Sequence, residues 1–169
     1  MAAEIERVFL LRALPEPMPA GEEWRIEQGY LPPASGTDPT QLEGRLRRIE
    51  RPDGTVEFVH TLKRGLGLVR EEVERTIARD EFDREWPRTA GRRLRKVRTR
   101  IAHGRHVWEV DRFLDLPVVL AECELERPDE LLELPAWLLP VVLREVTEEP
   151  AFRNSELARR AGLLGQAGG

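Results

Sequence analysis

The stretch from residue 94 to residue 114, LRKVRTRIAHGRHVWEVDRFL, alternates with a period of two on both sides of a tight turn at Gly104. Such alternation predicts β-strands, because successive side chains of a strand point to opposite faces. We therefore predict a hairpin of two strands, Leu94–Ala102 and His106–Leu114. Its polar face carries basic residues on the first strand and acidic residues on the second, namely Lys96, Arg98 and Arg100, then Glu109 and Asp111.

Other predicted strands repeat this sorting, and each carries charges of mainly one sign on its polar face. The acidic sets are Glu4 and Glu6, Glu72 and Glu74, and Glu122, Glu124 and Glu126, and the basic residues are Arg45, Arg47 and Lys63. A sheet with one solvated face explains simple alternation. It does not explain the sorting, because neighbouring like charges on such a face repel one another.

About eight predicted strands lie close together along the chain, with few helices between them. In chain order the strands are Ala3–Arg12, Arg25–Leu31, Gly44–Arg51, Thr55–Lys63, Val69–Ala78, Leu94–Ala102, His106–Leu114 and Val118–Glu126. We predict a helix at Arg79–Trp86, helical fragments over Glu130–Leu143, and a final helix that begins at Asn154 or Ser155 and ends at Arg160. Many short strands with few helices are typical of an antiparallel barrel or sandwich.

The composition indicates one globular domain. The chain has 169 residues, a formal net charge of −4, 40% hydrophobic residues and 34% charged residues. Its apolar stretches are too short or too broken by proline for a membrane span of about 20 residues, and its start lacks the features of a secretory signal. The lone Cys123 excludes an internal disulfide. We expect a cytoplasmic protein that binds no membrane and, being acidic overall, no nucleic acid.

The sorted charges point to a ligand that itself carries both signs. Clustered carboxylates are the oxygen ligands that a hard divalent cation prefers. Clustered arginine and lysine side chains bind phosphate oxygens. A surface that holds both sets would bind a metal–polyphosphate complex. If the sheet closes with its charged face inward, the interior becomes a hydrated binding tunnel, and the apolar faces pack outward against helices.

A series of short motifs follows one order along the chain. They are Glu4-Ile5-Glu6-Arg7-Val8-Phe9-Leu10, Gln28-Gly29-Tyr30-Leu31, Arg45-Leu46-Arg47, Thr61-Leu62-Lys63, Glu72-Val73-Glu74, Lys96-Val97-Arg98, Glu109-Val110-Asp111, Glu122-Cys123-Glu124 and Glu145-Val146-Thr147. In these motifs and their order, the chain resembles the CYTH family, or triphosphate tunnel metalloenzymes, from residue 4 to about residue 158. That family includes class IV adenylyl cyclases, thiamine triphosphatases and bacterial inorganic triphosphatases, and this chain is most similar to the last group.

The resemblance implies a fold, a reaction and a set of site residues. The implied fold is α+β, an eight-stranded antiparallel β-barrel with a few flanking helices over residues 1–160, followed by a flexible tail at 161–169. The implied reaction is hydrolysis of inorganic triphosphate or a related triphosphate, with Mg²⁺ or Mn²⁺ as cofactor. Substrate-binding residues would be Arg45, Arg47, Lys63, Lys96 and Arg98, metal ligands Glu4, Glu6, Asp111, Glu122 and Glu124, and catalytic residues Tyr30, Glu72 and Glu74. Homodimers occur in the family, although no residue here demands one.

One position departs from the family opening, which is Glu-x-Glu-x-Lys. Val8 stands where the family has its lysine, so one cationic phosphate contact is missing from the strand face of Glu4 and Glu6. The departure leaves a second interpretation open, a polyphosphate- or nucleotide-binding module with weakened turnover. Within the enzyme class, thiamine triphosphate and ATP are the alternative substrates.

Overall fold

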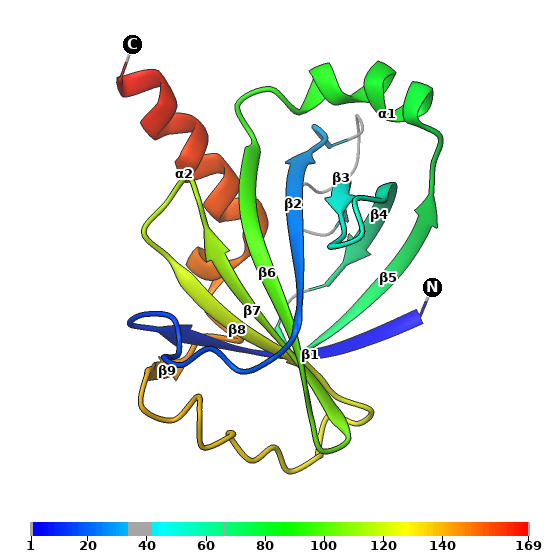
Figure 1. Ribbon diagram of the computed structural model, residues 1–169. Helices are drawn as coiled ribbons and strands as arrows, with labels where there is room; N and C mark the ends of the chain where they lie inside the picture. Colours follow the sequence, from blue (N-terminus) through cyan, green and yellow to red (C-terminus); the bar gives the residue numbers. More distant parts are fainter. Residues whose placement is uncertain (1, 34–41, 66, 169) are drawn as a thin grey trace.

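The computed structural model describes residues 2–33, 42–65 and 67–168 (Figure 1). These residues form nine strands, two α-helices and two short 3-10 helices. The elements are β1 (Ala2–Leu11), β2 (Glu22–Tyr30), β3 (Leu42–Glu50), β4 (Val56–Arg64), β5 (Val69–Thr76), α1 (Arg79–Glu85), η1 (Trp86–Thr89), β6 (Arg93–His103), β7 (His106–Phe113), β8 (Val119–Glu124), β9 (Val142–Glu145), η2 (Pro150–Phe152) and α2 (Asn154–Ala167). Within the described part of the chain, no helix is long and apolar enough to cross a membrane.

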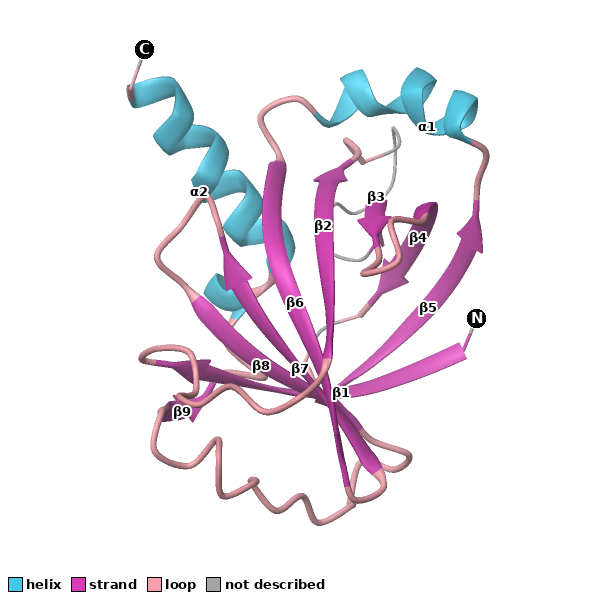
Figure 2. Ribbon diagram, viewed as in Figure 1, coloured by secondary structure: helices cyan, strands magenta, loops and turns pink. Residues whose placement is uncertain are grey.

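Eight of the strands close into an antiparallel barrel in the order β1-β8-β7-β6-β2-β3-β4-β5 (Figure 2). The barrel closes where β5 pairs with the first half of β1, so that Glu4 lies opposite Arg70. The second half of β1 pairs with the short strand β9 instead, and Phe9 lies opposite Glu145. The predicted eight-stranded antiparallel barrel is therefore confirmed. The strand β9 is an addition that the sequence analysis did not predict.

The apolar outer face of β1, β6, β7 and β8 forms the larger core of the molecule. Trp108 and Ala121 are fully buried in it, beside Phe9 and Ile101. No helix of the described residues covers this face, and the expected outward packing against a helix occurs instead at β3 and β4, against α1. Loop side chains cover this face, among them Leu14, Met18, Leu132, Leu134 and Leu138.

The predicted helical fragments over Glu130–Leu143 are wrong. Residues 131–135 have no regular secondary structure, turns follow over 136–141, and β9 begins at Val142. Pro135 and Pro140 explain the difference, because a proline inside a helix removes a backbone donor and clashes with the preceding turn.

The helix α2 closes one end of the barrel (Figure 1). Leu157 and Ala158, on its buried face, lie in one apolar cluster with Leu94, Phe113 and Leu120 of the strands. The helix continues to Ala167, beyond the predicted end at Arg160. The division into a domain at 1–160 and a tail at 161–169 stays a prediction.

Helix α1 (Figure 1) confirms the helix predicted at Arg79–Trp86, although it ends at Glu85, and it packs on the outside of the barrel. Phe82 of α1 is buried beside Leu46 of β3 and Ile77. This contact anchors β3, and with it the inner-face arginines on either side of Leu46.

Candidate active site

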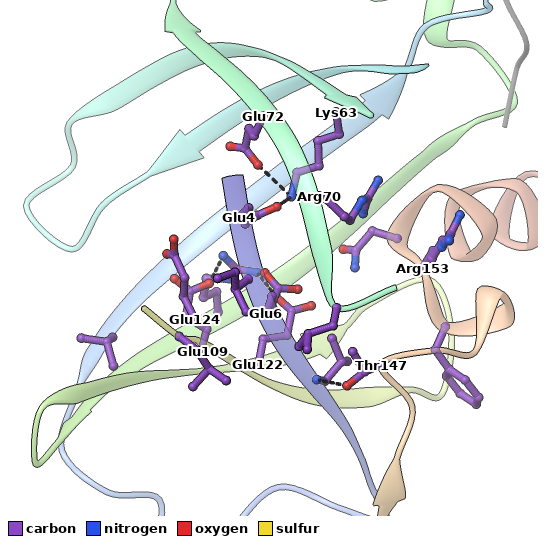
Figure 3. Close-up of a pocket in the computed structure, with 18 of the residues that line it drawn as sticks. Glu4, Glu6, Lys63, Arg70, Glu72, Glu109, Glu122, Glu124, Thr147 and Arg153 are labelled. Atoms are coloured by element: carbon purple, nitrogen blue, oxygen red, sulfur yellow. Dashed lines mark hydrogen bonds and ion pairs between the residues drawn. The ribbon is translucent and has the colours of Figure 1, made fainter. Parts of the chain in front are cut away.

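The barrel encloses a cavity of about 820 Å³ whose wall carries both signs of charge. All of the predicted site residues except Asp111 line it, namely Glu4, Glu6, Tyr30, Arg45, Arg47, Lys63, Glu72, Glu74, Lys96, Arg98, Glu122 and Glu124. They come from seven different strands, and Figure 3 shows several of them converging on one space. The charged faces of the strands therefore point into the barrel, a direction that the alternation in the sequence could not decide by itself.

Lys63 on β4 forms ion pairs with acidic residues of β1 and β5, the two strands whose pairing closes the barrel. Its Nζ donates a hydrogen bond to Glu4 Oε2 at 2.6 Å and lies 2.9 Å from Glu72 Oε2 (Figure 3). Burial favours the neutral form of Glu72, but Lys63 and then Arg45 outweigh it and lower the pKa of Glu72 to about 2. Glu72 therefore stays an anion at neutral pH.

Two arginines lie side by side on the inner face of β3. Arg47 Nη2 donates to Glu74 Oε2 at 2.5 Å, and the Thr61 hydroxyl donates to the same oxygen at 3.0 Å. Burial first, and then the charge of Arg45, lower the pKa of Arg47 to about 10. Arg47 remains a cation at neutral pH, and an anion entering the cavity would relieve its repulsion with Arg45.

Asp111 is the exception among the predicted metal ligands. Its side chain is completely buried, and both its oxygens accept hydrogen bonds, from Lys96 Nζ at 2.7 Å and from Arg98 Nε and Nη2 at 2.7 and 2.8 Å. Burial favours the neutral acid, but Arg98 and then Lys96 lower the pKa of Asp111 to about 2. The structure thus makes Asp111 the counter-ion that positions two predicted phosphate-binding cations, and does not bring it to the cavity wall.

Glu4 and Glu6 of β1 and Glu122 and Glu124 of the adjacent strand β8 form an acidic part of the cavity wall. Burial, and then the charge of Glu122, raise the pKa of Glu6 to about 8, and the nearby cations Lys63 and Arg98 do not offset this. Burial also raises the pKa values of Glu122 and Glu124, with Asp111 and Glu4 as the next causes.

The oxygen atoms of these acidic side chains are of the kind that bind divalent cations. Crowded carboxyl groups with raised pKa values become stable anions when a cation joins them, and carboxylate oxygens suit Mg²⁺ and Mn²⁺. Among the described side chains, no three acidic, histidine or cysteine groups already stand in a metal-binding arrangement. An ion held by Glu6, Glu122 and Glu124 would therefore require these side chains to move closer together.

If a divalent cation binds at this wall, its binding should release protons at neutral pH. Because the pKa of Glu6 is raised from 4.5 to about 8, its carboxyl is mostly protonated at pH 7 and must ionise to bind a cation. The affinity for Mn²⁺ should accordingly rise between about pH 6 and pH 8. Without metal, the contribution of Glu6 to folding stability should fall over pH 4.5 to 8, since the folded state holds the proton more tightly.

Calorimetric titration of Mn²⁺ in buffers of different ionisation enthalpy counts the released protons. Glu6→Gln should release fewer protons than the native protein and flatten the pH dependence. Glu23→Gln is the matched control, because Glu23 is exposed on β2. Equal proton release from the native protein and from Glu6→Gln would contradict the prediction.

Several residues that line the cavity were not predicted as site residues from the sequence. Arg70 shares the inner face of β5 with Glu72, and the period of two could have identified it. Thr147, Arg153 and Asn154 also line the cavity, but they lie outside the barrel strands. No pattern of alternation could have found them.

No family model matches the chain. The inorganic triphosphatase of Nitrosomonas europaea is 36% identical over 164 residues, which cover 92% of this chain and 96% of that protein. The chain belongs to the CYTH family of triphosphate tunnel metalloenzymes.

Solved structures show the same tunnel fold in related proteins. The crystal structure of an inorganic triphosphatase is 33% identical, with a TM-score of 0.58, and the match covers 94% of this chain and 96% of that chain. A putative adenylyl cyclase from Hippeastrum, described as having a dominant triphosphatase activity, has a TM-score of 0.53 at 17% identity, covering 75% and 81% of the two chains. At that identity the second likeness supports the fold alone.

Proposed function

We propose that this chain hydrolyses inorganic triphosphate to diphosphate and orthophosphate, with Mg²⁺ or Mn²⁺ as cofactor. One observation carries the proposal. Five predicted phosphate-binding side chains from three strands line a single cavity together with a cluster of glutamates, namely Arg45, Arg47, Lys63, Lys96 and Arg98. Such a cavity complements a highly charged anion that arrives with a divalent cation. The activity named for the relative from Nitrosomonas europaea supports the same substrate.

In this proposal the basic side chains bind the phosphate groups and stabilise the charge that develops on the departing diphosphate. A bound Mg²⁺ or Mn²⁺ would neutralise part of the charge on the phosphate chain. Its ligands would be the predicted metal ligands that line the cavity, Glu4, Glu6, Glu122 and Glu124. Glu72, an anion at neutral pH, is suited to accept a hydrogen bond from the attacking water. The water attacks the terminal phosphorus, and the bond from that phosphorus to the bridging oxygen breaks.

Tyr30 and Glu74 complete the predicted catalytic set. The Tyr30 hydroxyl accepts a hydrogen bond from Gln28 Nε2 at 3.0 Å and lies near the end of the barrel that α2 closes. It can donate its own proton to a phosphate oxygen. Glu74 holds Arg47 in the cavity through their ion pair. A cytoplasmic location, a small-molecule triphosphate as the partner and a homodimeric assembly are proposed from the family resemblance.

Phosphate release from tripolyphosphate, ATP and thiamine triphosphate, each with Mg²⁺, Mn²⁺ or EDTA, tests the function. We expect metal-dependent release from tripolyphosphate that EDTA abolishes. Glu72→Gln should lower the rate roughly 100-fold or more, since a positioned carboxylate contributes on that scale. Glu71→Gln is the matched control, because Glu71 is the exposed neighbour on the other face of β5.

Other outcomes identify the alternatives. Faster turnover of ATP or thiamine triphosphate than of tripolyphosphate would assign the chain an organic substrate. Tight binding of tripolyphosphate without turnover of any substrate would refute the proposal in favour of a binding module.

A further inference from the structure

Asn154 is the first residue of α2, but its side chain does not cap the helix. Asparagine at the start of a helix commonly accepts a backbone N–H of the first turn, whereas the described residues give α2 no side-chain cap. Asn154 Oδ1 instead accepts hydrogen bonds from Lys96 Nζ at 2.8 Å and from Gln28 Nε2 at 3.2 Å. The Asn154 side chain therefore joins α2 to the strands β6 and β2.

The chemistry of Lys96 fixes which way the two amide groups face. Lys96 can only donate hydrogen bonds, so Asn154 must turn its oxygen toward it. Gln28 turns its Nε2 toward the same oxygen, and its own buried Oε1 has no hydrogen-bond partner among the described residues. Because a buried acceptor without a partner costs stability, this arrangement indicates that the contact between Asn154 and Lys96 controls the others.

Lys96 is held from two sides in the cavity wall. Its side chain is almost fully buried, and its Nζ donates to Asp111 Oδ2 at 2.7 Å as well as to Asn154. An ammonium group carries three N–H donors, which rotate together about the last bond of the side chain. Two acceptors in fixed positions stop this rotation and leave one direction for the third N–H.

We propose that Asn154 is a positioning residue, which together with Asp111 directs the third N–H of Lys96 toward a phosphate oxygen of the bound triphosphate. This inference rests on the proposed function and concerns the same site. Asp111 alone would hold the charge of Lys96 without fixing the direction of its donors. Because Asn154 begins α2, that direction depends on the docking of the helix, which the buried side chains of Leu157 and Ala158 secure.

Lys63 and Lys96 are the only lysines of the chain, so their ammonium groups can be observed separately. Magnetic resonance spectra of protein labelled with ¹⁵N at lysine Nζ contain two such signals, and Lys63→Met assigns them. Burial, and then the charge of Arg98, lower the pKa of Lys96 to about 8, so the group is still an ammonium at pH 6. Spectra at pH 6 therefore report on the hydrogen bonds of Lys96 without any turnover.

Asn154→Ala should shift the Lys96 signal and speed the exchange of its protons with water, because one N–H loses its acceptor. The Lys63 signal should not change, since Lys63 pairs with Glu4 and Glu72 instead. Asn154→Asp is the conservative variant, because its carboxylate keeps an acceptor oxygen on a side chain of the same length. Its Lys96 protons should exchange as slowly as those of the native protein.

Two further spectra complete this experiment. Gln166→Ala is the matched control, since Gln166 is an exposed amide on the same helix, and it should leave both signals unchanged. Tripolyphosphate added to the native protein with EDTA present should shift the Lys96 signal, because the third N–H gains a phosphate oxygen.

Steady-state kinetics separate positioning from a merely structural role. Asn154→Ala should lower kcat for tripolyphosphate roughly 10-fold, the effect of one hydrogen bond to a charged group, and change KM by less than about twofold. The charge of Lys96 remains and still attracts the substrate, whereas the alignment of its donor with the developing charge is lost. In protein that carries Lys96→Met, adding Asn154→Ala should not lower kcat further.

The two proposals fail in different ways. Native protein that binds tripolyphosphate without hydrolysing it would refute the proposed function, and the Lys96 signal would still decide about Asn154. The inference would be overturned if Asn154→Ala left that signal and its proton exchange unchanged, or if tripolyphosphate did not shift it. An equal loss of kcat from Asn154→Ala with and without Lys96→Met would also overturn it, because Asn154 would then not act through Lys96.

Discussion

Asp111→Ala is expected to destabilise the folded protein by about 3–5 kcal/mol, the typical cost of removing one partner from a buried ion pair. Asp111 is completely buried and accepts hydrogen bonds from both Lys96 and Arg98, which are themselves almost fully buried. Its removal takes from buried Lys96 its carboxylate partner, whereas Arg98 keeps Glu109 and Glu122. Urea denaturation of the metal-free protein measures the loss.

Asp129→Ala is the control for this substitution. Asp129 is exposed, and its contact with Arg127 spans 3.8 Å between two exposed side chains. Its replacement should change the free energy of unfolding by less than about 0.5 kcal/mol. If Asp111→Ala folded with native stability and lost only metal affinity, Asp111 would be a metal ligand, as its place in the sequence pattern implied, and the assignment as a counter-ion would be wrong.

The second large effect is expected from Arg47→Ala, which should lower kcat/KM for tripolyphosphate roughly 100- to 1,000-fold. Losses of this size follow the removal of one preorganised donor to a charge that develops in the transition state. Arg47 is nine-tenths buried and lies in the cavity next to Arg45. Its loss should cost little stability, because the repulsion between the two guanidinium groups disappears with it.

Arg48→Ala is a closely matched control, since the neighbouring arginine points to the other face of β3. Arg48 pairs with Glu50 at 3.2 Å and is not part of the cavity wall. Its replacement should change kcat/KM by about twofold at most, given the small contribution of exposed ion pairs. Phosphate-release assays over a range of tripolyphosphate concentrations measure both variants. Similar losses in Arg47→Ala and Arg48→Ala would show that net charge, and not position in the tunnel, controls the rate.

The sequence by itself determined the eight barrel strands and which residues share a face. Alternation is a local property, because each side chain of a strand points opposite to the next one whatever the strand pairs with. The spacing alone therefore groups Lys96 with Arg98 on one face, and Glu122 with Glu124 on another. The order of the motifs, through the family resemblance, added the closed barrel and the inward direction of the charged faces.

The tertiary structure alone decided which charges meet. Asp111 and Glu122 look alike in the sequence, yet Asp111 is neutralised by two cations, whereas burial and other acids raise the pKa of Glu122. The difference arises from strand neighbours, since Asp111 lies opposite Arg98 on β6 and Glu122 lies opposite Val8 on β1. Arg153 lines the cavity although it lies outside the barrel strands, in the segment between β9 and α2. Such contacts join residues far apart in the chain, and no periodicity within one strand contains that information.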